Sequence, residues 1–131
     1  MRPKVLVIDD EEGFTKILKM NLERNDAYEV HVENNSMNAL AVARDFRPDV
    51  ILLDIVMPGL DGGDIAAQFA DHPYLRRVPV IMLTALVAQD ETNPEAVVQA
   101  GAMNVLPKPV NMDLLTRCIN NALQKSDSAG A

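Results

Sequence analysis

The chain has 131 residues, a length that predicts one domain. Hydrophobic residues make up 48% of the chain, which is enough for a core, but only 4% are aromatic and tryptophan is absent, so we expect an aliphatic core. The net charge of −7 argues against direct binding of nucleic acid, because neutralising phosphates requires a basic patch.

The cysteine content and the apolar runs predict a cytoplasmic protein. Cys118 is the only cysteine, so no intramolecular disulfide can form, which suits a reducing compartment. Residues 1–4 lead straight into an apolar run and lack the pattern of a secretory signal. The apolar runs are only as long as strands and are interrupted by aspartate, so we expect no membrane insertion.

The first part of the chain alternates strand and helix patterns. Residues 5–8 form an apolar run typical of a strand buried on both faces, and residues 14–22 carry apolar side chains at helical spacing. Residues 28–33 alternate apolar and polar side chains, which predicts an edge strand with one polar face. We expect Ser36 to cap a helix that includes residues 40–46.

The middle of the chain repeats this alternation. Residues 50–53 predict a second fully buried strand that ends in Asp54, and residues 57–59 predict a turn. A helix is then expected around residues 65–69, capped by Asp61 and Asp64. Residues 78–83 predict a fourth strand that ends at Thr84.

The last part of the chain contains the fifth strand and a final helix. Residues 85–93 are polar and typical of a loop, and residues 94–101 predict a short helix that starts at Pro94 and ends at Gly101. Residues 105–106 predict a short strand, and residues 115–122 carry the apolar face of the last helix. Residues 126–131 are small and polar, so we expect a flexible tail.

Alternating strands and helices with continuously apolar strands predict an α/β domain, a doubly wound five-stranded parallel sheet with helices on both faces. Ligands of such sheets bind at the carboxyl ends of the strands, at the point where the strand order reverses. Unusual polar residues follow the strands here. We expect them to converge at one edge: Asp9, Asp10, Asp54, Thr84 and Lys108.

Three converging carboxylates predict a magnesium site, because Mg²⁺ prefers hard oxygen ligands and offsets their mutual repulsion. An aspartate in such a site can also attack phosphorus and form an aspartyl phosphate. That reaction needs charge neutralisation and positioning, which Lys108 and Thr84 can supply. We interpret Glu11 and Glu12 as structural residues of the first helical turn, where acids interact favourably with the helix dipole.

Four motifs in order resemble the receiver domain of two-component response regulators over roughly residues 3–125. They are the strand that ends in Asp9 and Asp10, "LLDIVMPGLDG" around Asp54, "IMLTA" with Thr84, and "AGAMNVLPKP" with Lys108. The resemblance implies a flavodoxin-like fold with strand order 2-1-3-4-5. It also implies a receiver domain over residues 1–125 and a flexible tail over residues 126–131.

The resemblance implies a role for each matching residue. Asp54 would be the phosphoacceptor. Asp10 would bind Mg²⁺ directly, Asp9 would help partly through water, and the backbone carbonyl of Val56 would complete the protein ligands.

Thr84 would donate a hydrogen bond to a phosphoryl oxygen, and Lys108 would form an ion pair with the phosphoryl group. The Lys108–Pro109 peptide bond would be cis. Two features depart from the family. Val105 replaces the usual aromatic residue three positions before the lysine, and residues 84–101 are about two residues longer than in short members.

The function implied is a phosphorelay signalling module that takes a phosphoryl group from a sensor histidine kinase or a histidine phosphotransfer protein. Its output partner would bind the surface of the fourth helix, fifth strand and last helix. It would not be an enzyme, apart from its own phosphorylation and slow self-dephosphorylation, for which Val56 and Leu86 offer no side chain that orients water. The alternatives are a small Mg²⁺-dependent phosphohydrolase that forms an aspartyl phosphate, and a scaffold that never switches.

Overall fold

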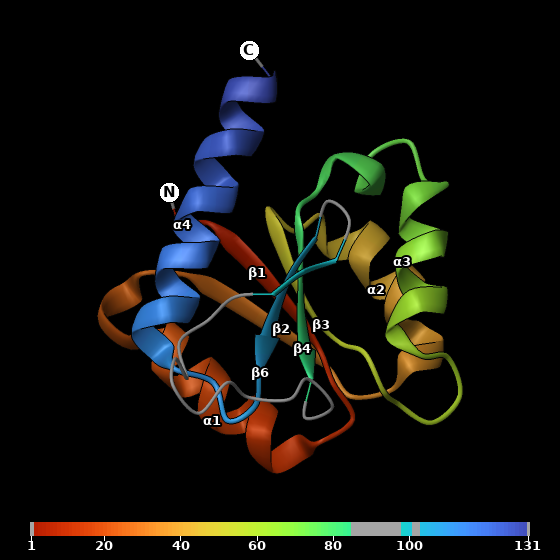
Figure 1. Cartoon of the computed structure of the whole chain (residues 1–131), viewed down its shortest axis with the longest axis horizontal. Coiled ribbons are helices and arrows are strands. Elements are labelled where there is room, and N and C mark those ends of the chain that lie inside the picture. Colours follow the sequence, from red (N-terminus) through yellow and green to blue (C-terminus); the bar gives the residue numbers. More distant parts are fainter. Residues whose placement is uncertain (1, 85–97, 101–102, 131) are drawn as a thin grey trace.

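The computed structural model describes residues 2–84, 98–100 and 103–130. Strands and helices alternate along these residues (Figure 1). The strands are β1 (Lys4–Ile8), β2 (Glu29–Glu33), β3 (Val50–Asp54), β4 (Val80–Thr84), β5 (Val98–Ala100) and β6 (Met103–Pro107). The α-helices are α1 (Glu12–Leu22), α2 (Ala39–Phe46), α3 (Gly62–Ala70) and α4 (Met112–Gly130). Short 3₁₀ helices are η1 (Arg24–Asp26), η2 (Ser36–Asn38) and η3 (Leu75–Arg77).

The strands form one sheet in the order β2-β1-β3-β4-β6-β5. Neighbouring strands among β2, β1, β3, β4 and β6 pair in parallel. This confirms the five parallel strands that were predicted and their order. The order reverses between β1 and β3, so the carboxyl ends of these two strands flank the expected ligand site. The remaining strand, β5, lies at the edge of the sheet and pairs antiparallel with β6, and this strand was not predicted.

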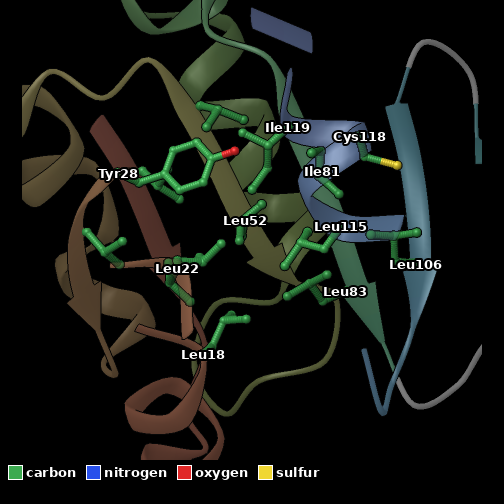
Figure 2. Close-up of a cluster of buried hydrophobic side chains, with 14 residues drawn as sticks. Leu18, Leu22, Tyr28, Leu52, Ile81, Leu83, Leu106, Leu115, Cys118 and Ile119 are labelled. Carbon is green, nitrogen blue, oxygen red and sulfur yellow. The ribbon is translucent and has the colours of Figure 1, made fainter. Parts of the chain in front are cut away.

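Helices cover both faces of the sheet, as predicted. On one face, α1 and α4 pack against the strands, and Figure 2 shows this core, in which Leu22 and Leu115 lie with strand residues such as Leu52 and Leu83. On the other face, α2 and α3 pack over a second core that contains Phe69. Both cores are almost entirely aliphatic, in agreement with the composition.

Two predicted segments differ from the structure. Residues 98–100 belong to a strand, although residues 94–101 were expected to form a helix. Glycine ends helices but also favours tight strand connections, so Gly101 did not distinguish the two, and β-branched Val98 suits a strand. Residues 85–97 lie outside the described residues.

The last helix continues to Gly130, through most of the segment expected to be a tail (Figure 1).

Within the described residues, none of the helices combines the length and the apolar character that crossing a membrane would require.

Candidate functional site

Asp9 is held rigidly at the carboxyl end of β1. Its backbone N–H donates to the carbonyl of Glu33 at 3.1 Å, and its carbonyl accepts a hydrogen bond from Asn34 Nδ2 at 2.8 Å. Its side chain is fully buried, and Oδ1 accepts the N–H of Glu11 at 2.9 Å. The carboxylate is therefore fixed by the turn that joins β1 to α1.

Asp54 is the last residue of the central strand β3, and only 4% of it is exposed. Its Oδ1 accepts the N–H of Val56 at 3.3 Å. The chain then turns back sharply, because Gly62 at the start of α3 donates its N–H to the carbonyl of Ile55 at 2.8 Å. A Cβ at Gly62 would lie 2.6 Å from the carbonyl oxygen of Asp54, so only glycine fits this approach.

The side chain of Ser36 holds the loop that follows Asp54. Our prediction that Ser36 caps the following helix was wrong. Asn35 instead caps η2, by accepting the N–H of Met37 at 3.0 Å. The buried hydroxyl of Ser36 donates to the carbonyl of Pro58 at 2.8 Å and accepts the N–H of Leu60 at 3.1 Å. A serine that begins a helical pattern cannot reveal from sequence that its hydroxyl reaches a distant loop.

Lys108 follows β6 and reaches the site from the opposite side. Its N–H donates to the carbonyl of Thr84 at 3.0 Å, and the bond to Pro109 is cis, as the resemblance implied. Its Nζ lies 2.6 Å from Asp9 Oδ2, 2.8 Å from Glu11 Oε1 and 3.4 Å from Asp54 Oδ2. One ammonium group thus contacts three carboxylates.

The pKa values of Asp9 and Lys108 follow from these surroundings. Burial raises the pKa of Asp9, and the nearby Asp54 adds to the rise, against the opposing effects of Lys108 and the N–H of Glu11. Burial lowers the pKa of Lys108, but its contacts with Asp9 and Glu11, helped by Asp54, outweigh burial and raise it. Lys108 therefore remains charged at neutral pH.

Carboxylate oxygens of Asp9, Glu11 and Asp54 lie within 4.8 Å of one another, and the donor set fits Mg²⁺. Asp9 Oδ2 is buried and pairs with the ammonium of Lys108 at 2.6 Å, so this oxygen already faces a cation. The oxygen-only chemistry of the group suits a hard divalent ion rather than a soft metal.

The structure brings together most of the residues predicted to form the site. Asp9, Asp54 and Lys108 are in contact, and the buried Thr84 ends the neighbouring strand β4. Asp10 is exposed and does not belong to the carboxylate group. Val56 is 52% exposed at the rim of the site, and Leu86 lies outside the described residues.

Glu11 is the residue of this group that our interpretation missed. We assigned it a structural role in the first turn of the helix, but its side chain contacts Lys108, 97 positions away in the sequence. The one sequence signal was its position two residues after Asp9, at the end of a buried strand.

The family model described as the response regulator receiver domain matches residues 5–120. The response regulator PleD of Caulobacter vibrioides is 35% identical over 111 residues, which cover 85% of this chain and 24% of PleD. The regulatory protein AtoC of Escherichia coli is 36% identical over 121 residues, which cover 92% of this chain and 25% of AtoC. The chain therefore spans about a quarter of the length of these two relatives.

A solved structure with a similar fold is the receiver domain of the sensor histidine kinase PA1611 from Pseudomonas aeruginosa. It has a TM-score of 0.78 and 27% identity, and the match covers 95% of this chain and 99% of that one. That crystal structure has a magnesium ion coordinated in its active-site cleft.

Proposed function

Because this chain belongs to the family of response regulator receiver domains, which are phosphorelay signalling modules, we propose that Asp54 is the residue that accepts the phosphoryl group. The observation that carries this proposal is the position of Asp54. It ends the central strand with its carboxylate 3.4 Å from the ammonium of Lys108, beside the buried carboxylate of Asp9.

In the proposed reaction, a carboxylate oxygen of Asp54 attacks the phosphorus of a phosphohistidine. The P–N bond breaks as the new O–P bond forms, and the imidazole leaves with the electron pair of the broken bond. Lys108, 3.4 Å from Asp54 Oδ2, would lie beside the phosphoryl oxygens on which negative charge gathers. Such positioned charge supplies most of the rate enhancement in phosphoryl transfer. The hydroxyl of Thr84, at the end of the next strand, would bond a phosphoryl oxygen.

We expect Mg²⁺ to be bound by the carboxylates of Asp9, Asp10 and Asp54 and by the carbonyl of Val56. When bound, the ion neutralises the charge of the phosphoryl oxygens. The buried Oδ2 of Asp9 and the short distances between Asp9 and Asp54 support this proposal. Asp10 is exposed, so as a direct ligand its side chain would have to turn toward the group.

Receiver domains are signalling modules, and we expect a sensor histidine kinase or a histidine phosphotransfer protein as the phosphoryl donor. The proposed output surface comprises β6, α4 and the segment predicted as the fourth helix, residues 94–101. Of that segment the structure describes only residues 98–100. Residues 1–125 would form the receiver module, and residues 126–131 would extend from it. A cytoplasmic location is also part of this proposal, and the single, buried Cys118 suits it.

Phosphorylation can be tested with acetyl phosphate and Mg²⁺, a donor that replaces the kinase. Intact-mass spectrometry should detect one added phosphoryl group on the parent protein and none on Asp54→Asn. Glu12→Gln serves as a control, because it also removes one charge, at the start of α1, but leaves the proposed acceptor and every proposed Mg²⁺ ligand. Stoichiometric modification of Asp54→Asn would show that another residue is the acceptor.

A further inference from the structure

Glu11 contacts the ammonium of Lys108 although its own side chain is 60% exposed. The distance from Glu11 Oε1 to Nζ is 2.8 Å, and that from Asp54 Oδ2 to Nζ is 3.4 Å. The exposed carboxylate of Glu11 is thus nearer to Lys108 than the carboxylate of Asp54, the proposed phosphoacceptor.

Asp9, the other carboxylate close to Lys108, differs from Glu11 because it is buried and fixed in place. The buried Asp9 lies 2.6 Å from Nζ, but hydrogen bonds to its backbone and Oδ1 fix its position. Bound Mg²⁺ would neutralise Asp9 and weaken its attraction for the lysine. Glu11 is not among the ligands proposed for the ion, so it would remain charged and able to follow the ammonium, because its side chain is 60% exposed.

We propose that Glu11 competes with Asp54 for Lys108 and thereby slows phosphorylation of this domain. The inference rests on the proposed function of Asp54. An exposed ion pair is weak and easily broken, so Glu11 adjusts the rate of phosphorylation rather than preventing it. It is a positioning residue, which acts on the phosphoryl group through Lys108.

The test compares Glu11→Gln with Glu12→Gln at saturating Mg²⁺ and limiting acetyl phosphate. Both variants lose one negative charge at the start of α1, but the Glu12 side chain has no ion pair within the described part of the chain. Loss of one exposed ion pair corresponds to a rate about two- to fivefold higher. We expect that increase for Glu11→Gln, and a rate close to that of the parent for Glu12→Gln.

A third variant separates contact with Lys108 from charge alone. Glu11→Asp keeps the charge but shortens the side chain by one methylene group, so its carboxylate should no longer reach Nζ. Competition for Lys108 predicts that this variant is also faster than the parent. A Glu11→Asp rate equal to the parent's would mean that Glu11 only repels the anionic donor, and the inference would be wrong.

The outcomes also separate this inference from the proposed function. If the parent is phosphorylated on Asp54 but Glu11→Gln and Glu12→Gln react at the same rate, Glu11 does not compete for Lys108, while the function of Asp54 stands. If the parent takes up no phosphoryl group, the proposed function fails and this inference fails with it.

Discussion

Replacing Lys108 by methionine should destabilise the fold by an amount that grows with pH. Methionine keeps most of the length of the lysine side chain but removes the ammonium that lies 2.6 Å from the fully buried Asp9. Removing one partner of a buried ion pair typically costs about 3–5 kcal/mol, because it leaves an uncompensated charge in the interior.

Protonation of Asp9 sets an upper limit on this cost. A carboxyl group with an ordinary pKa of 3.8 takes up a proton at a cost of about 1.4 kcal/mol for each pH unit above that value. The limit is therefore about 4 kcal/mol at pH 7 and about 1.6 kcal/mol at pH 5.

The sign of the pH dependence follows from the direction of the pKa shift. Burial raises the pKa of Asp9 in the folded state, so the unfolded state releases this proton first as the pH rises. The contribution of Asp9 to the free energy of unfolding thus falls as the pH rises above 3.8. Removing Lys108 raises the pKa of Asp9 in the folded state further, so this fall becomes larger. The parent keeps Lys108 charged at both pH values, because the pKa of Lys108 is raised.

Urea unfolding in Mg²⁺-free buffer at pH 5 and pH 7 measures the effect. The variant Lys108→Met should lose clearly more stability relative to the parent at pH 7 than at pH 5. Adding Asp9→Asn to it should recover much of the loss at pH 7. An equal loss at both pH values, or no recovery in the double variant, would refute the idea that the unpaired Asp9 is responsible.

Three further changes test other parts of the site. Ser36→Ala should lower the free energy of unfolding by about 1–3 kcal/mol, because it leaves two backbone groups of the loop after Asp54 without their partner; a loss in urea unfolding below about 0.5 kcal/mol would contradict this. Asp10→Ala should reduce the Mg²⁺-dependent rise in Tm because an oxygen ligand is lost, whereas Glu12→Ala should retain the parental rise; equal rises in both variants would exclude Asp10 as a ligand. Val56→Asn should speed loss of the phosphoryl group about tenfold, because a polar side chain at this rim can orient water. Intact mass followed after removal of acetyl phosphate measures that loss, and an unchanged rate would show that Val56 does not control access of water.

The positions of Asp9, Asp54 and Lys108 could be predicted because they depend on regular features. Apolar runs identify buried strands, and parallel strands place the residues that follow them at one edge of the sheet. The contacts among these side chains, at 2.6 Å and 3.4 Å, confirm that reasoning.

The role of Glu11 and the strand at residues 98–100 could not be predicted in the same way. Whether an exposed glutamate reaches Lys108 depends on the path of the turn after β1 and on a contact 97 residues away, and periodicity describes neither. Strand β5 is short, and a pairing with β6 sets its conformation more than its own composition does. Ser36 was misassigned for a related reason, since its partners belong to a loop more than twenty positions later.

Gly62 has a consequence for how sequences with this fold can vary. It touches neither the phosphoryl group nor the metal in any step proposed above, yet an added methyl group would lie 2.6 Å from the carbonyl oxygen of Asp54 and 2.8 Å from the Cα of Ile55. Both neighbours are backbone atoms that cannot move aside without shifting the end of β3. A mutational scan should therefore find Gly62 as intolerant of replacement as the acidic residues, although the cause is crowding rather than chemistry.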